Sequence, residues 1–255
     1  MKYIVLIPAR YESTRFPGKP LAKICGKEMI VRVCRQVAKT GFDLAVATDD
    51  ARIAQAVEKA GFKAVMTAAT HHSGTERVEE AYRNLGSDAD VVINVQGDEP
   101  FIDPAQIKTL ASLFDEDPDT RIATLAMRFN PEEGLLALQD PNLVKLTVSD
   151  RGEALYFSRS VIPYVRKYPA EEWLEKVRFL THIGIYAYRA ETLREIVALP
   201  ESGLEKAESL EQLRWLQNGY RVKVGLSHKR TIGIDTPADL RRAEEFFMRT
   251  ESNFL

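Results

Sequence analysis

The loop after the first apolar run carries three cations, Arg10, Arg15 and Lys19, on a stretch that also holds three prolines (IPARYESTRFPGKPL, residues 7–21). Backbone N–H groups of a turn-rich loop bind anions, and arginine offers two parallel donors to phosphate oxygens. One charge pair at about 4 Å is worth roughly 4 kcal/mol at an effective dielectric constant near 20. This composition predicts a polyphosphate site.

A solvated loop with scattered charges accounts for the same composition nearly as well. The prolines favour a site, because a mere connection has no need of a stiff backbone. The loop has neither the GxxxxGK[ST] pattern of a Walker A loop nor the GxGxxG pattern of a dinucleotide fold.

Two acidic segments far apart in the chain are the second candidate for chemistry. NVQGDEP ends an apolar run with Asp98 and Glu99, and GIDTPADL places Asp235 before the last helical segment. Mg²⁺ binds proteins through one or two carboxylates together with substrate phosphates and water. We therefore expect Asp98 and Asp235 to hold magnesium, and Glu99 either to be structural or to support the metal ligands without binding the metal itself.

Asp235 also stands where it could cap that last helix. However, Thr236 and Asp239 already have the spacing of a capping box, with Pro237 at the first helical position. Asp235 is therefore not needed as the helix cap and is available to bind a ligand.

The histidines give no metal signal, because His71, His72, His182 and His228 lack the spacing of a zinc site. His71 and His72 fit a polar loop. His182 opens an apolar, aromatic segment, where sugar contact and simple packing both remain open.

The elements that must position these residues alternate between strand and helix over the first half. Apolar runs at 3–7, 44–48, 63–67 and 90–98 alternate with helical periodicity at 28–41, 51–61, 74–86 and 104–114. This order predicts an α/β fold with a doubly wound, mostly parallel sheet. Ligands of such sheets bind beyond the carboxyl ends of the strands. The loops after the first and fourth strands are therefore the expected site.

The alternation breaks in the second half. A hairpin over 143–157 with Gly152 in its turn is followed by a strand at 182–189 and helices at 190–199 and 206–219. Strands at 220–226 and 231–234 and a helix at 237–249 complete the chain. We expect one domain, 1–255, with an inserted β-rich subregion at about 143–190.

Composition bounds the function. The 255 residues carry a net charge of −2, without the basic excess of nucleic-acid or membrane-surface binding. Two cysteines make no disulfide framework, and neither a signal peptide nor a membrane-length apolar run is present. We expect a soluble, cytoplasmic protein.

Eight segments together resemble one family: IPARYESTRFPGKPL, ATDD, HHSGTERV, NVQGDEP, ALYFSRSVIPY, HIGIYAYR, ESLEQLRWL and GIDTPADL. Their order is similar to that of the bacterial CMP-Kdo synthetases, the 3-deoxy-manno-octulosonate cytidylyltransferases. The resemblance runs from about Ile4 to Leu240. The first segment marks nucleotidyltransferases broadly, and SRSVIPY, HIGIYAYR and ESLEQLR narrow the family.

This resemblance implies a nucleotide-diphospho-sugar transferase-like fold that joins CTP and Kdo into CMP-Kdo and pyrophosphate for lipopolysaccharide assembly. The residues implied for the triphosphate are Arg10, Ser13, Arg15 and Lys19. Those implied for the cytidine are Ser73, Gly74, Thr75, Arg77 and Gln96. Those implied for Kdo are Arg159, His182, Tyr186 and Gln212. It also implies Mg²⁺ on Asp98 and Asp235, and a homodimer joined through the β-rich part.

The expected mechanism is in-line attack of the Kdo 2-hydroxyl on the α-phosphorus of CTP, without a protein nucleophile. Arg15 and Lys19 would stabilise the leaving pyrophosphate, and the metal held by Asp98 and Asp235 would lower the pKa of the hydroxyl and orient it. Two alternatives stay open: a cytidylyltransferase for a related sugar acid (8-amino-Kdo or a sialic acid), and a non-catalytic nucleotide-binding protein.

Overall fold

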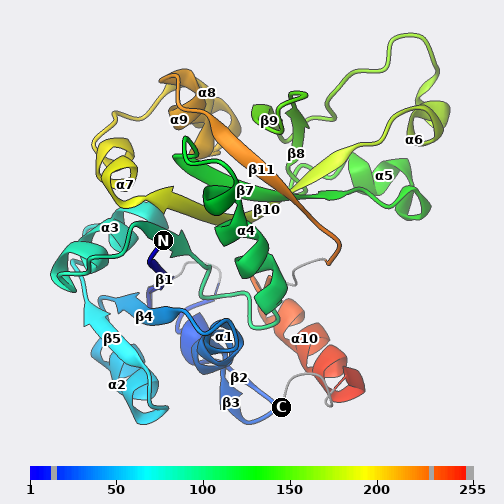
Figure 1. Cartoon of the computed structure of the whole chain (residues 1–255). Coiled ribbons are helices and arrows are strands. Elements are labelled where there is room, and N and C mark those ends of the chain that lie inside the picture. Colours follow the sequence, from blue (N-terminus) through cyan, green and yellow to red (C-terminus); the bar gives the residue numbers. More distant parts are fainter. Residues whose placement is uncertain (13–15, 230–232, 251–255) are drawn as a thin grey trace.

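The structure is a computed structural model that describes residues 1–12, 16–229 and 233–250. Within these residues, nine strands form one sheet whose main path runs β11-β7-β10-β6-β1-β4-β5, and β8 and β9 extend it from β10 (Figure 1). The β1–β4, β1–β6, β4–β5 and β7–β11 pairs are parallel, whereas β10 is antiparallel to both of its neighbours on the path. The predicted α/β fold with a mostly parallel sheet is confirmed.

The elements have these bounds. The strands are β1 (Tyr3–Ala9), β2 (Lys23–Ile24), β3 (Lys27–Glu28), β4 (Asp43–Thr48), β5 (Lys63–Met66), β6 (Val91–Asn94), β7 (Ile122–Arg128), β8 (Lys145–Val148), β9 (Ala154–Ser158), β10 (Leu180–Arg189) and β11 (Val222–Ser227). The α-helices are α1 (Met29–Ala38), α2 (Ala51–Lys59), α3 (Gly74–Asn84), α4 (Pro104–Glu116), α5 (Gly134–Leu138), α6 (Trp173–Lys176), α7 (Ala190–Val197), α8 (Gly203–Glu208), α9 (Gln212–Gln217) and α10 (Pro237–Thr250). Short 3-10 turns are η1 (Lys19–Leu21), η2 (Pro131–Glu133) and η3 (Ala170–Glu172).

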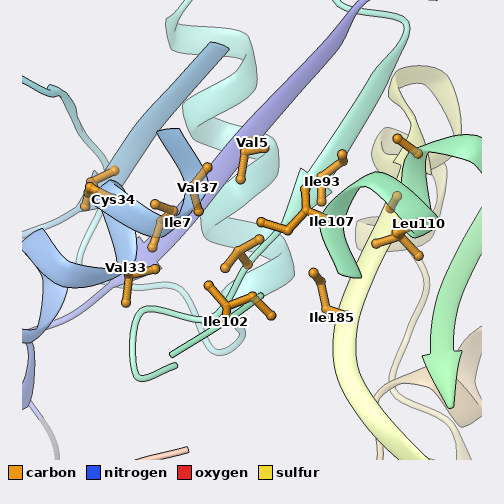
Figure 2. Packing of buried hydrophobic residues seen from close by; sticks show 14 of the residues in the cluster. Val5, Ile7, Val33, Cys34, Val37, Ile93, Ile102, Ile107, Leu110 and Ile185 are labelled. Carbon is orange, nitrogen blue, oxygen red and sulfur yellow. The ribbon is translucent and has the colours of Figure 1, made fainter. Parts of the chain in front are cut away.

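Helices cover both faces of the sheet because successive residues of a buried strand point to opposite sides. Val5 and Ile7 of β1 pack in one core with α1, α2 and α4, whereas Ile4 and Leu6 pack in another with α3, α7 and α9. On α1 the buried positions recur at helical spacing: Ile30, Val33, Cys34 and Val37. Figure 2 shows Val33, Cys34 and Val37 of this helix beside Val5 and Ile7.

The strand order reverses beside β1. From β1 the chain passes through α1 to β4 on one side, and later places β6 on the other. The carboxyl ends of β1 and β6 therefore diverge into connections on different sides, which is where doubly wound sheets bind ligands. In the described part of the chain no helix is long and apolar enough to cross a membrane.

Several details differ from the sequence prediction. Strand β7 was not predicted, although it lies between β10 and β11. The single helix predicted at 206–219 is split into α8 and α9 by Ser209, whose backbone is left-handed (φ 51°). Of the strand predicted at 231–234, residues 231 and 232 lie outside the described residues, and Gly233 and Ile234 are not in a strand. The capping box predicted for Thr236 and Asp239 is confirmed, and Asp103 caps α4 in the same way.

Candidate active site

A cleft of about 260 Å³ lies at the switch point between β1 and β6. Its walls come from the end of β1, η1, the start of α3, the loop after β6 and the segment before α10. The residues that line it are Pro8, Ala9, Arg10, Lys19, Pro20, His71, His72, Ser73, Gly74, Arg77, Gln96, Gly97, Asp98 and Asp235. The loops expected to carry the site therefore meet in one cavity.

Three charged side chains from distant segments converge in this cleft. The Lys19 Nζ donates to Asp98 Oδ2 at 2.7 Å and to Asp235 Oδ1 at 3.1 Å. Asp98 follows β6, and Asp235 precedes α10 with its backbone N–H bonded to Asp239. The backbone of Ile234 is in turn tied to the Asp98 carbonyl at 3.0 Å. The two carboxylates thus face a common position, although they are 137 positions apart in the chain.

This donor set suits magnesium. Mg²⁺ prefers oxygen ligands, and it uses one or two carboxylates and completes its octahedron with water and phosphate oxygens. Asp98 and Asp235 already turn oxygens toward one cation, the Lys19 ammonium. Among the residues described, no group of three or more His, Cys, Asp or Glu side chains forms a fuller metal cage. The expected ligands therefore fit a metal that is shared with a substrate.

Gly97 makes the close approach of the two walls possible. A Cβ atom at this position would lie 2.8 Å from the Pro8 carbonyl oxygen and 3.4 Å from the Ile30 side chain. Real Cβ atoms do not come that close to a backbone oxygen, so a larger residue would push the β6 loop away from β1. The glycine thereby sets the width of the cleft beside Asp98.

Another wall of the cleft is the start of α3. Ser73 caps this helix by accepting the Glu76 N–H, and Gly74 lines the cleft one residue later. The N-terminal end of a helix presents free N–H groups and favours anions. Arg10 extends from the end of β1 into the same cavity and is exposed.

Arg77 is held by protein groups. Its guanidinium donates to Asp49 Oδ2 at 2.8 Å, to Thr67 Oγ1 at 2.7 Å and to the Ala68 carbonyl at 3.2 Å. The side chain is almost fully buried. Arg77 therefore stiffens the floor beneath the cleft, with Asp49 as its ion-pair partner.

Thr75 lies beside the cleft without lining it. Its hydroxyl donates to Glu211 Oε2 at 2.7 Å. Burial raises the pKa of Glu211, and the Thr75 hydrogen bond partly offsets this effect. Glu211 directly precedes α9, so this contact links the proposed nucleotide wall to the helix that carries Gln212.

His71 was set aside at the sequence level but lines the cleft. Its Nε2 bonds to Glu80, and its Nδ1 lies 3.7 Å from Glu76. Burial acts to raise the pKa of Glu80, but hydrogen bonds from the Ala68 N–H and from His71 outweigh it and hold that pKa below its usual range. His71 is thus an anchored ring, and its position two residues before Ser73 was the signal available in the sequence.

The residues expected to bind the sugar lie apart from this cavity, and none of them lines it. The rings of His182 and Tyr186 have centroids 5.3 Å apart, and Tyr186 packs edge-on against Trp215 of α9. Burial lowers the pKa of His182 to about 3, so this imidazole is neutral at physiological pH. Its Nε2 is 3.0 Å from Thr124 Oγ1.

Three polar atoms in this aromatic region are buried without a hydrogen-bond partner in the described residues: the hydroxyls of Tyr186 and Tyr188 and the Gln212 amide nitrogen. Such groups cost free energy unless a ligand or water satisfies them. Three of the four expected sugar residues, His182, Tyr186 and Gln212, therefore lie in one region with unused hydrogen-bonding capacity.

Arg159 is engaged differently. Its guanidinium donates to the backbone carbonyls of Glu208 at 2.6 Å, Pro141 at 2.9 Å and Ser209 at 3.3 Å. These bonds tie the end of β9 to the link between α8 and α9. Ser13 and Arg15, expected at the triphosphate, lie outside the described residues.

Comparisons with known proteins point in one direction. Residues 4–229 match the family described as Cytidylyltransferase. The chain is 55% identical over 246 residues to a 3-deoxy-manno-octulosonate cytidylyltransferase of Bacteroides thetaiotaomicron, covering 96% of this chain and 98% of that protein. It is 50% identical over 240 residues to the protein of the same name in Porphyromonas gingivalis, covering 94% of each.

A solved structure is also similar: that of CMP:2-keto-3-deoxy-manno-octonic acid synthetase complexed with CTP. The two chains superpose with a TM-score of 0.90 at 42% identity, covering 98% of this chain and all of the other. The match of the family over most of the sequence, and of the fold over nearly all of it, shows that this chain belongs to the cytidylyltransferase family.

Proposed function

We propose that this chain transfers the cytidylyl group of CTP to 3-deoxy-manno-octulosonate (Kdo), releasing pyrophosphate and supplying CMP-Kdo for lipopolysaccharide assembly. The observation that carries the proposal is the cleft between β1 and β6, where Arg10 and Lys19 meet Asp98 and Asp235. The names of the relatives point to the same reaction. A cavity with cations for phosphates and carboxylates for a shared metal suits phosphoryl transfer better than mere nucleotide storage.

In this proposal the nucleotide lies along the cleft. The triphosphate contacts Arg10, Lys19, Ser13 and Arg15, and the cytidine lies against the start of α3, by Ser73, Gly74 and Thr75, with Gln96 nearby. Arg77 acts from beneath, because its guanidinium is bonded to Asp49 and Thr67. Loss of the Arg77 side chain would therefore disturb the floor of the site as well as any contact with the base.

The chemistry is in-line displacement at the α-phosphorus. Mg²⁺ held by Asp98 and Asp235 would offset charge on the α-phosphate and lower the pKa of the attacking hydroxyl. Lys19, with Arg15, would stabilise charge on the departing pyrophosphate. The chain's share of catalysis is then to align the two substrates and to meet the charge that develops.

The acceptor sugar is proposed to lie near His182, Tyr186 and Gln212. The unsatisfied Tyr186 hydroxyl and Gln212 amide can bond sugar hydroxyls, and a neutral imidazole can donate or accept. Arg159 is the weaker member of this set, because its N–H groups already donate to three carbonyls. It would contribute chiefly by fixing the approach of α9.

We also propose a homodimer joined through the β-rich part. Figure 1 shows β8, β9, α5 and α6 at one end of the molecule, with the loop between β9 and α6 reaching away from the sheet. Exposed apolar side chains gather there: Leu155 is 62% and Tyr164 is 74% exposed. Sedimentation should show a dimer that Tyr164→Glu weakens, whereas Leu204→Glu on α8 leaves it intact. A wild-type monomer would contradict this proposal.

The decisive experiment is product formation. Purified protein with CTP, Mg²⁺ and Kdo should yield CMP-Kdo and an equal amount of pyrophosphate, followed by ³¹P NMR. Omission of the sugar should abolish pyrophosphate release. Parallel reactions with 8-amino-Kdo and a sialic acid identify the acceptor. Absence of sugar-dependent release with all three would refute a cytidylyltransferase and favour the nucleotide-binding alternative.

A further inference from the structure

Lys19 occupies the position that the two aspartates would offer to a metal. Its ammonium is 2.7 Å from Asp98 Oδ2 and 3.1 Å from Asp235 Oδ1. The lysine side chain is only 16% exposed, less than either carboxylate partner at 31% and 52%. The lysine side chain as a whole is thus more buried than the side chains of both acids.

This arrangement conflicts with the one that catalysis needs. A magnesium ion takes carboxylate oxygens at about 2.1 Å, which would bring it within a few ångströms of an ammonium bonded to the same oxygens. Two cations so close repel each other strongly, since the site is partly shielded from water. Lys19 and a divalent ion therefore cannot share Asp98 and Asp235 in the observed geometry.

The Lys19 ammonium also has other partners within reach in the proposed complex. It begins η1, just after Gly18, and lines the cleft in which the triphosphate is proposed to lie. Its four-carbon stem lets the ammonium turn while the backbone stays in place. Triphosphate oxygens would replace the carboxylate oxygens as its partners.

We propose that Lys19 is the resident cation of this site: its ammonium holds the Asp98 and Asp235 carboxylates together in the free protein and moves to the triphosphate when a divalent ion takes its place. The inference rests on the proposed function, because it assigns the metal and the nucleotide to this cleft. Without the ammonium, two carboxylates that face one position would repel each other.

The exchange couples metal and nucleotide binding. A divalent ion that arrives alone must displace the ammonium, so its affinity for the free protein is low. A triphosphate offers the displaced ammonium new partners and raises that affinity. By linkage, the metal raises the affinity for the nucleotide by the same factor.

Direct metal binding tests this role without any measurement of turnover. Mn²⁺ is titrated into nucleotide-free protein and followed by the EPR signal of the free ion. Lys19→Met should bind Mn²⁺ about tenfold more tightly than the wild type, because the competing charge is gone. Lys19→Arg, which keeps a cation, should bind it as weakly as the wild type does.

Lys23→Met is the matched control, since it removes one positive charge from an exposed position on the nearby β2. Its Mn²⁺ affinity should equal that of the wild type. Lys19→Gln is measured in parallel, so that a folding defect in one variant does not end the comparison. Unchanged or weaker Mn²⁺ binding in the folded Lys19 variants overturns the inference.

A second set of Mn²⁺ titrations is made in the presence of CTP. After correction for the Mn²⁺–CTP complex, CTP should strengthen Mn²⁺ binding by a larger factor in the wild type than in Lys19→Met. The product assay separates the two claims. If the wild type forms CMP-Kdo while the Lys19 variants bind Mn²⁺ no more tightly, only the resident-cation role fails. If no CMP-Kdo forms, the proposed function fails, whatever the Mn²⁺ titrations show.

Discussion

Replacement of Gly97 by alanine should widen the cleft and weaken both fold and activity. The added methyl group would lie 2.8 Å from the Pro8 carbonyl oxygen, and the Ile30 side chain at 3.4 Å limits movement in another direction. Pro8 cannot withdraw easily, because β1 is hydrogen-bonded to β4 on one side and to β6 on the other. The loop after β6 must therefore shift by a few tenths of an ångström.

Overpacking of this kind costs about 1–3 kcal/mol of unfolding free energy. Because Asp98 is the next residue, the same shift moves a proposed metal ligand relative to Lys19. A displacement of 1 Å can cost about 10²-fold in rate, so a smaller shift should lower kcat/KM by about tenfold. Urea denaturation measures the first effect, and pyrophosphate release with CTP and Kdo measures the second.

Gly203→Ala is the matched control. Gly203 is the first residue of α8, and a Cβ there meets nothing within 4 Å. Its stability and kcat/KM should stay at the wild-type values or rise slightly, because alanine is favoured in helices. If Gly97→Ala equals the wild type in both measurements, the close approach of the β6 loop to β1 does not set the geometry of the cleft.

Three further changes probe other parts of the molecule. Asp98→Asn should lower turnover by about 10²-fold or more at saturating Mg²⁺ with the unfolding midpoint unchanged, and near-normal turnover would remove Asp98 from the mechanism. His182 should make the fold less stable as pH falls below 6.5, because the unfolded imidazole takes up a proton that the folded one, with its pKa lowered to about 3, does not. Urea denaturation between pH 7 and pH 4 should show a smaller loss of stability for His182→Gln than for the wild type, whereas His228→Gln should keep the full loss. Lys145 is fully buried, and its ammonium donates to three backbone carbonyls. Lys145→Met should lower the free energy of unfolding by about 2 kcal/mol or more, because these carbonyls lose their donor. An unchanged urea midpoint would contradict that role.

The part of the site that follows from strand order could be predicted from the sequence. Alternating strands and helices require the loops after β1 and β6 to meet at the switch point, and Arg10, Lys19 and Asp98 lie on those loops. Asp235 could be predicted as a metal ligand because Thr236 and Asp239 already accounted for the helix cap. These conclusions needed only the direction of the strands and local capping rules.

Strand β7 was missed because its pairing is remote in sequence. Its residues are apolar but include the small Ala123 and Ala126, which give a weak local strand signal. It becomes a strand because β10 and β11, which both lie much later in the sequence, pair with its two edges. The antiparallel direction of β10 depends on the long excursion through β8, β9 and α6, and local periodicity carries no information about such a path.

The break between α8 and α9 has a similar cause. The sequence over 206–219 has continuous helical periodicity, yet Ser209 adopts a left-handed backbone. At this break the Glu208 carboxylate accepts from the Ser158 hydroxyl and the Arg159 N–H, and the Glu208 and Ser209 carbonyls accept from the Arg159 guanidinium. Contacts with β9 therefore override a local preference for helix.

The two halves of the proposed site differ in what positions them, strand order in one and long-range contacts in the other. The nucleotide half stands on sheet topology, so a change there should act directly on CTP and on the metal. The sugar half depends on the ties that Arg159 makes to the α8–α9 link and on the Thr75–Glu211 bond, which joins α9 to α3. Glu211, which bonds to Thr75 beside the proposed nucleotide wall, directly precedes Gln212 of the proposed sugar site. The contact that joins the proposed sugar half to the proposed nucleotide half therefore lies at the start of α9, beside the helix break that the sequence did not predict.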